Sequence, residues 1–206
     1  MILKKKLIIL DLDGVILDSK NNMKFAWNKT NKKFNLNVNF ERYFENIGLP
    51  FHEILIKLKI KPSKRISNFF KQASIEKINL IKLYKTVKNF INLLERKKIQ
   101  YSIVTSKDLF RTKLFLKKFK IKPLSIHCPN KKLRGKPYPD HLIKVLKKNH
   151  IIKDDACYVG DTMVDYLAAK NAKISFIFAK YGYGKNSKLY KNKISKFSDL
   201  KKYIDI

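Results

Sequence analysis

Short apolar segments alternate with amphipathic helical segments along most of the chain after residue 85. Each helical segment that separates two of them has ten or more residues, with apolar side chains three and four positions apart. Strands joined by helices of this length form right-handed βαβ units and a parallel sheet. The sequence therefore predicts an α/β core, a Rossmann-like parallel sheet flanked by helices. Strands are expected at 4–10, 101–106, 124–128, 156–161 and 174–179, and helices at 86–98, 109–119, 139–150, 163–172 and 197–204.

The segment between the first and second predicted strands has a helical pattern throughout. Amphipathic helices are expected at 21–34, 50–60 and 62–84, with breaks at Gly48–Pro50 and Lys61–Pro62. We interpret residues 19–84 as a helical cap domain. This cap is inserted into a core domain that residues 1–18 and 85–206 form together.

Polar side chains stand where several of the predicted strands end. The set consists of Asp11 and Asp13 after the first strand, Thr105 and Ser106 at the end of the second, Asp161 with Asp165 four residues later, and Lys136 in a loop before a helix. In an open parallel sheet, ligands bind at the shared edge where the carboxyl ends of the strands lie. We therefore expect these residues to form one site.

The residue types in this set favour phosphate chemistry. Clustered carboxylates repel one another and need a cation, and an oxygen-rich site without His or Cys suits Mg²⁺. Beside Mg²⁺ and Lys136, a phosphate could also accept hydrogen bonds from hydroxyl groups and from backbone amides near Gly14. One carboxylate can attack phosphorus, and a second can act as general acid and then as base. Taken singly, the carboxylates and hydroxyls also fit helix N-caps or Asx turns, and Lys136 fits a solvated side chain.

Four motifs carry a resemblance to a known family: "DLDGV" at 11–15, "VTS" at 104–106, "KP" at 136–137 and "GDTMVD" at 160–165. Their order and approximate spacing resemble those of the haloacid dehalogenase-like hydrolase superfamily. The chain looks like the branch of phosphoglycolate phosphatase and β-phosphoglucomutase, whose helical cap is inserted after the first strand. It departs from that branch at Lys85-Thr86, where relatives often have Pro-Gly, at Lys173, where Gly is common, and at Ser106, where Asn is frequent.

This resemblance implies an Mg²⁺-dependent phosphomonoester hydrolase that acts on a small phosphorylated metabolite, phosphoglycolate-like or sugar-phosphate-like, through an aspartyl-phosphate intermediate. It implies Asp11 as the nucleophile and Asp13 as the acid and base. For the phosphate, it implies binding by Thr105, the Ser106 amide and Lys136, and Lys136 would also compensate charge in catalysis. For the metal, it implies binding by Asp11, the Asp13 carbonyl and Asp161. Asp165 would orient a metal-bound water or Lys136. An acid at position 13 favours phosphate esters over carbon–halogen bonds, because a halide leaves without a proton.

The cap segment "ENIGLPFHEIL" at 45–55 resembles a cap segment of the same branch, in a loop that can face the active site. We name Arg42, His52 and Glu53 as candidate substrate contacts on this basis. Taken singly, each also fits a surface position.

Two other functions stay open from the sequence. A phosphomutase on the same scaffold would differ only in cap contacts that the sequence does not reveal. A net charge of +31 is compatible with a nucleic-acid binder, but only five of the 47 basic residues are arginine and lysines occur in nearly every segment. Because Lys, Asn and Ile share A/T-rich codons, we interpret the charge as compositional and expect no nucleic-acid partner.

The remaining composition favours a cytoplasmic enzyme. No apolar run reaches the ~18–20 residues of a membrane span, so no membrane partner is expected. Cys128 and Cys157 have neither metal-ligand spacing nor the pattern of a disulfide framework. We expect a monomer or a homodimer.

Overall fold

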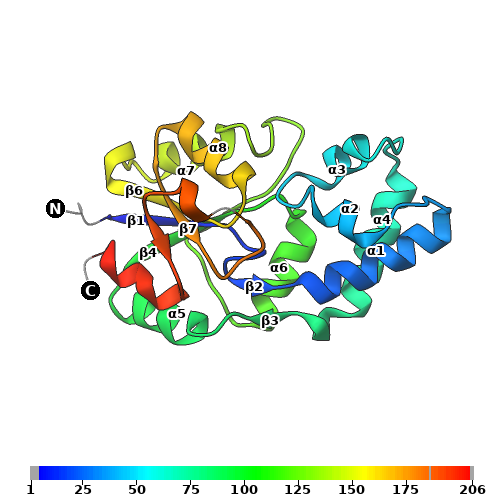
Figure 1. Cartoon of the computed structure of the whole chain (residues 1–206). Helices are drawn as coiled ribbons and strands as arrows, with labels where there is room; N and C mark the ends of the chain where they lie inside the picture. The colour runs from blue at the N-terminus through cyan, green and yellow to red at the C-terminus, as the bar shows by residue number, and fades with distance from the viewer. Residues whose placement is uncertain (1–4, 186, 205–206) are drawn as a thin grey trace.

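A computed structural model of the chain, which describes residues 5–185 and 187–204, contains one large parallel sheet (Figure 1). Its six strands lie in the order β5-β4-β1-β6-β7-β8, and every neighbouring pair is parallel. The strands are β1 (Leu7–Leu10), β4 (Gln100–Val104), β5 (Ser125–His127), β6 (Ala156–Gly160), β7 (Ser175–Ala179) and β8 (Lys193–Ile194). The predicted α/β fold with a Rossmann-like sheet is thus confirmed, and β8 is a strand that the sequence analysis missed.

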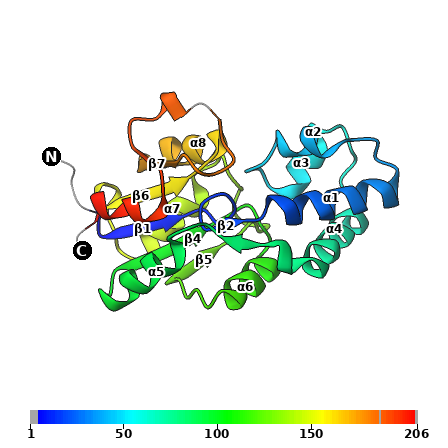
Figure 2. The same ribbon diagram turned by 60° about the horizontal axis from the view of Figure 1, so that its bottom comes forward.

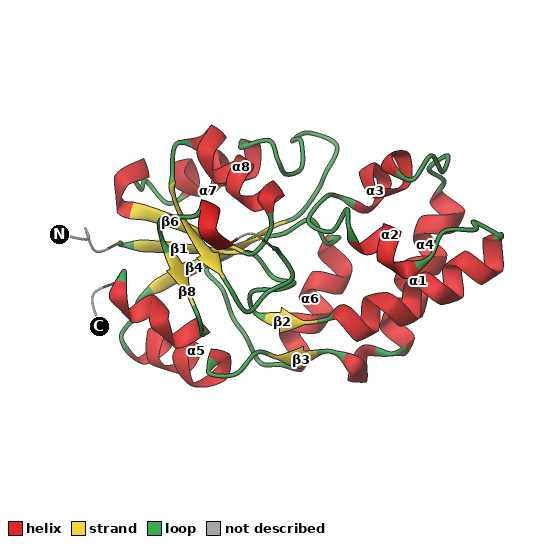
Figure 3. Cartoon of the chain, viewed as in Figure 1, coloured by secondary structure: helices red, strands yellow, loops and turns green. Residues whose placement is uncertain are grey.

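Helices cover both faces of the sheet (Figure 3). They are α5 (Val87–Arg96), α6 (Leu109–Lys118), α7 (Asp140–Lys148), α8 (Met163–Ala172) and the C-terminal 3-10 helix η4 (Phe197–Lys202). Alternate residues of β1 enter two different hydrophobic clusters, Ile8 and Leu10 with α5, α6 and η4, and Leu7 and Ile9 with α7 and α8. A strand buried on both faces needs an uninterrupted apolar run, which explains the sequence "LIIL".

The inserted segment forms a separate group of helices beyond one end of the sheet (Figure 2). These helices are α1 (Lys20–Phe34), α2 (Phe40–Phe44), α3 (Phe51–Lys57) and α4 (Lys64–Glu76). They share a hydrophobic cluster of their own, in which the Trp27 ring stacks on Tyr43 at 4.4 Å between centroids. The indole N–H of Trp27 donates to the carbonyl of Val38, so this large side chain is buried without an unpaired donor.

A short antiparallel ribbon joins the inserted helices to the sheet. It consists of β2 (Leu17–Asp18) and β3 (Lys82–Leu83). The predicted helix over 62–84 is therefore wrong at its C-terminal end: α4 ends at Glu76, the 3-10 helix η1 (Ile78–Leu80) follows, and the chain becomes extended to pair with β2. The predicted division at 18/19 and 84/85 lies at this ribbon and stays a prediction.

Among the described residues, no helix has the length and the apolar character that crossing a bilayer requires.

Candidate active site

Three of the predicted residues come together because their strands are neighbours. Asp11 follows β1, Thr105 follows β4 and Asp161 follows β6, and β1 lies between β4 and β6. Leu10 of β1 is in register with Ile103 of β4 and Val159 of β6, so all three strands end at the same level. The parallel sheet thus gathers at one edge side chains that are 56 or more positions apart in the chain.

The loop after β1 requires a glycine at position 14. Gly14 has a φ of 87°, which side chains rarely tolerate, and an added Cβ would overlap the carboxylate of Asp161. The turn places Asp13 beside the same cavity as Asp11. There the Asp13 carboxylate accepts a hydrogen bond from the Ser19 hydroxyl, and its other oxygen lies 3.1 Å from Lys107 Nζ.

Lys136 is the central cation of this site. Its side chain is 2% exposed, and Nζ lies 3.0 Å from Asp11 Oδ1 and 2.6 Å from Asp165 Oδ1. Burial opposes the charged form of the lysine, but the two carboxylates together outweigh it and raise the pKa of Lys136 above its usual range. The ammonium group is therefore held between the end of β1 and the start of α8.

Both carboxylate oxygens of Asp165 already accept hydrogen bonds from the protein. Oδ1 accepts from Lys136 and from the Tyr158 hydroxyl, and Oδ2 accepts from the amide and the hydroxyl of Thr162 in a capping box at the start of α8. Burial acts against the charged carboxylate, but these donors, with Lys136 foremost, lower the pKa of Asp165. Asp165 therefore orients Lys136 and caps α8.

The carboxylate of Asp161, in contrast, has a hydrogen-bond donor on only one of its oxygens. Its Oδ2 accepts from the Tyr183 amide at 2.6 Å, while its buried Oδ1 has no hydrogen-bond partner in the described part of the chain. Burial, with Asp165 and Asp11 nearby, raises the pKa of Asp161 well above its ordinary value. Burial also raises the pKa of Asp11, to about 7, although Lys136 opposes the change.

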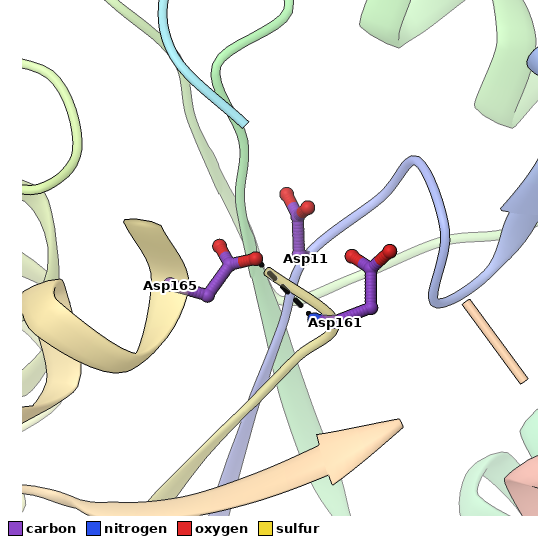
Figure 4. A group of neighbouring side chains, drawn as sticks. All are labelled: Asp11, Asp161 and Asp165. Carbon is purple, nitrogen blue, oxygen red and sulfur yellow. Dashed lines mark hydrogen bonds between the residues drawn. The ribbon is translucent and has the colours of Figure 1, made fainter. Parts of the chain in front are cut away.

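These three carboxylates form a compact acidic group (Figure 4). One ligand atom from each of Asp11, Asp161 and Asp165 lies within 4.8 Å of the others. Because Asp165 is fully engaged, the free oxygens belong to Asp11 and Asp161, and two buried carboxylates whose charge is disfavoured fit a divalent cation between them. The residues present are thus suited to Mg²⁺.

Thr105 and Ser106 face the same cavity from the end of β4. The Thr105 hydroxyl accepts from the Lys107 amide at 3.2 Å, which fixes the turn that follows the strand. The Ser106 hydroxyl donates to the carbonyl of Gly48, which lies between α2 and α3 in the inserted helical segment. We call this segment, from α1 to α4, the cap and the rest of the chain the core. The Ser106 side chain therefore joins the core to the cap.

A cavity of about 50 Å³ lies between these core residues and the cap. From the core, the lining comprises Asp11, Asp13, Thr105, Ser106, Lys107, Arg111, Lys136, Thr162 and Tyr183; from the cap, it comprises Met23, Tyr43, Ile47, Gly48, Leu49, Phe51, Ile54 and Phe70. This volume counts the positions open to the centre of a water molecule, and at about 10–15 Å³ for each water it has room for a few waters or one small group. The cap contribution is apolar apart from the Tyr43 hydroxyl and the backbone.

The three predicted cap contacts do not line this cavity. Arg42 is exposed, and His52 and Glu53 line a different surface depression, next to residues 129–135 and Tyr138. Helix α3 begins at Phe51 and directs Ile54 inward, so the polar residues between them point elsewhere. The structure brings Phe51 and Ile54 to the cavity in their place.

Sequence reasoning missed Lys107, Arg111 and Tyr183, all of which reach the cavity. Lys107 directly follows Thr105 and Ser106, which was the available signal, but one lysine among so many is not conspicuous. Burial lowers the pKa of Lys107, and Asp13 partly restores it. Tyr183 ties three places together: its amide holds Asp161, its hydroxyl contacts Ser19, and its ring packs on Phe44 of the cap.

Known proteins resemble this chain in sequence. The family model of the haloacid dehalogenase-like hydrolases matches residues 8–179. Phosphoglycolate phosphatase of Aquifex aeolicus is 28% identical over 209 residues, covering 97% of each chain, and pyrophosphatase PpaX of Oceanobacillus iheyensis is 23% identical over 170 residues, covering 81% of this chain and 79% of the other.

Solved structures share the fold over nearly their whole length. A hydrolase from Pseudomonas syringae superposes with a TM-score of 0.84 at 22% identity, covering 95% of this chain and 96% of that one. CbbY from Rhodobacter sphaeroides, solved with phosphate, has a TM-score of 0.81 at 16% identity and the same coverage.

Proposed function

The chain belongs to the haloacid dehalogenase-like hydrolases, and from this membership we propose that it hydrolyses a phosphomonoester of a small metabolite, with Mg²⁺, through an aspartyl-phosphate on Asp11. Its family and its phosphatase relatives identify it as an enzyme, a phosphatase. The observation that carries the mechanistic part is the position of Lys136 between Asp11 and Asp165, beside an Asp161 whose buried oxygen has no partner.

The metal would be held by the carboxylates of Asp11 and Asp161 and by the backbone carbonyl of Asp13. Bound there, Mg²⁺ would offset negative charge on the phosphoryl group. Lys136 would offset charge on the attacking carboxylate, and Asp165 would keep Lys136 in place. Thr105 and the Ser106 amide would hold the remaining phosphate oxygens.

The reaction would proceed in two displacements at phosphorus. A carboxylate oxygen of Asp11 attacks, the bond between phosphorus and the leaving oxygen breaks, and Asp13 gives its proton to that oxygen. Asp13, now a carboxylate, then takes a proton from water as the water attacks the phosphorus of the aspartyl-phosphate. Inorganic phosphate leaves, Asp11 is regenerated as a carboxylate and Asp13 is again protonated.

The size of the cavity implies that the cap must move for substrates to enter. A volume of about 50 Å³ does not admit a metabolite such as a sugar phosphate. The hinge of this movement would be the β2–β3 ribbon, since its two strands connect the cap helices to the sheet. Closure would exclude bulk water during attack on the ester.

Phosphate release from a panel of short esters tests this proposal. We expect release by the wild type with Mg²⁺, none with a chelator, and a loss of roughly 10³-fold or more in kcat for Asp11→Asn, because the amide is not a nucleophile. Asp154→Asn, which changes an exposed aspartate outside the cavity, is the matched control and should behave as the wild type. Undiminished release by Asp11→Asn would disprove the assignment of the nucleophile.

A further inference from the structure

The proposed reaction does not account for the contacts of Tyr183. This residue belongs to the loop after β7, and its backbone amide donates to Asp161 Oδ2 at 2.6 Å. The loop lies against Asp161 on both sides of Tyr183, because a Cβ added to Gly182 would overlap the Asp161 side chain and one added to Gly184 would overlap the Asp161 carbonyl. The position of this loop therefore fixes the position of the Asp161 carboxylate.

The hydroxyl of Tyr183 is bound to the segment that leads from the core into the cap. It accepts a hydrogen bond from the Ser19 amide at 2.7 Å and donates one to the Leu17 carbonyl at 3.2 Å. Leu17 belongs to β2 of the ribbon, and Ser19 immediately precedes α1. The two hydrogen bonds thus hold Tyr183 to the proposed hinge.

The ring of Tyr183 packs against the cap itself. Although Tyr183 is a core residue, its side chain contacts the hydrophobic cluster that the cap helices form. It packs edge-on against Phe44, the last residue of α2, at 5.2 Å between ring centroids. A single residue therefore connects a carboxylate of the proposed metal site with the hinge and with the cap.

These contacts would differ between a closed and an open cap. Opening at the β2–β3 ribbon would move Phe44 away together with α2, whereas Asp161 would stay at the end of β6 in the core. Tyr183 would then lose its support on the cap side, and its amide would be less firmly held against Asp161 Oδ2. A carboxylate that is already oriented loses less conformational freedom when it becomes a metal ligand, so a closed cap favours cation binding.

We propose that Tyr183 is a positioning residue that couples binding of a divalent cation at Asp161 to closure of the cap. This inference rests on the proposed function, because it takes Asp161 as a ligand of the metal. With the cap closed, Phe44 holds Tyr183 in place, and the affinity of the site for the cation rises. By thermodynamic reciprocity, the occupied site favours the closed cap by the same factor.

A substitution in the cap tests this coupling without changing a metal ligand. Phe44→Ala removes the ring that packs on Tyr183, and Phe44 itself lies outside the cavity lining. We expect the Kd for Mg²⁺, measured by isothermal titration calorimetry without substrate, to rise roughly 2- to 10-fold, the amount that one aromatic pair can contribute. Phe44→Tyr keeps the ring and should keep the affinity of the wild type.

Phe34→Ala is the matched control. Phe34 is, like Phe44, a half-buried residue that ends a cap helix, with an aromatic ring edge-on and a cation over its own ring. Its aromatic neighbour is Phe69, which belongs to α4 of the cap and not to the core. Its removal should loosen the cap to a similar degree and leave the Kd for Mg²⁺ unchanged.

A double variant shows whether Phe44 acts through Tyr183. Tyr183→Ala alone should raise the Kd for Mg²⁺ at least as much as Phe44→Ala does. If the effect of Phe44 passes through Tyr183, adding Phe44→Ala to Tyr183→Ala should raise the Kd no further. Two increases that simply multiply would mean that the residues act independently, and would overturn the coupling.

The position of the cap measures the reciprocal effect. Nitroxide labels can be attached at two exposed positions, Lys33→Cys in the cap and Lys147→Cys in the core, since the native cysteines are buried. Electron–electron double resonance then gives the distance distribution between the labels. Mg²⁺ alone should shift this distribution toward the closed cap in the otherwise wild-type protein, and less so when Tyr183→Ala is added.

Three further results would each overturn the inference alone: an unchanged Kd in Phe44→Ala, an equal rise of the Kd in Phe34→Ala, or a label distance that Mg²⁺ does not change in the wild type. All three leave the dependence of phosphate release on Mg²⁺ and Asp11 intact. A wild-type protein that binds no Mg²⁺ would instead overturn the proposed function, and the inference with it.

Discussion

Asp161 and Asp165 lie four residues apart, yet their surroundings favour opposite charge states. Asp165 accepts hydrogen bonds on both oxygens and lies 2.6 Å from Lys136, so its pKa is lowered despite its burial. Asp161 has one amide donor and one buried oxygen without a partner, so its pKa is raised. Such a difference between neighbouring carboxylates marks Asp161 as the one that needs an additional cation.

This contrast predicts that Asp161→Asn changes the stability of the protein differently with and without metal. Without Mg²⁺, the variant should be at least as stable as the wild type, because the amide removes a disfavoured buried charge and can still accept from Tyr183. With Mg²⁺ at a hundredfold excess over its Kd, the wild type should gain roughly 5–10 °C in Tm and the variant almost nothing. Differential scanning fluorimetry with and without a chelator measures both. An equal Mg²⁺-dependent gain in the variant would place the metal elsewhere.

Helix ends account for two of the departures from the resembled family. Thr86 precedes α5 with a φ of 70°, and Lys173 follows α8 with a φ of 57°. Both backbones are left-handed, a conformation that costs a residue with a Cβ about 1 kcal/mol and glycine very little. The chain therefore keeps the helix geometry at these positions without the glycine that relieves the strain.

Lys173→Gly should consequently stabilise the protein by about 1 kcal/mol. Lys170→Gly, one turn earlier on the exposed side of the same helix, should destabilise it by about the same amount, because its backbone is helical. Urea unfolding of the two variants at equal Mg²⁺ concentration compares them directly. A loss of stability in Lys173→Gly would mean that the lysine side chain itself supports the end of α8.

The contact between cap and core depends on close approach of the backbone at Gly48. This residue has a φ of 100°, its carbonyl accepts from Ser106, and an added Cβ would lie 2.7 Å from the hydroxyl of Thr162. The cap loop therefore rests on the two core turns that follow β4 and β6. A side chain at position 48 would push the cap loop away from the core.

At the scale of the whole molecule, Gly48→Ala should hinder closure of the cap on the core. We expect kcat/KM for phosphate esters to fall by roughly tenfold or more, since a closed cap is needed to exclude water and to position the ester. Steady-state phosphate release measures the effect, and Glu45→Ala, at an exposed position of the same cap loop, is the control. Full activity of Gly48→Ala would show that this contact is not required for turnover.

At the scale of the whole molecule, the predictions failed mainly where pairing partners lie far apart in the chain. Lys82–Leu83 has a helical pattern with the residues before it, but its partner is Leu17–Asp18, so it becomes a strand. The two-residue strand β8 pairs with Phe178 and Ala179, and nothing local distinguishes it from a loop. Short elements of this kind depend on tertiary hydrogen bonds rather than on their own propensity.

The sequence by itself determined the parallel sheet and the gathering of Asp11, Thr105 and Asp161 at its edge. Periodicity fixes the order of strands and helices, and parallel strands necessarily end on the same side. Only the tertiary structure decided which residues complete the site. Lys107 and Arg111 line the cavity, whereas the predicted contacts Arg42, His52 and Glu53 lie outside it. The packing of the cap on the core decides which side chains reach the cavity, and the spacing of residues along a single helix does not encode that packing.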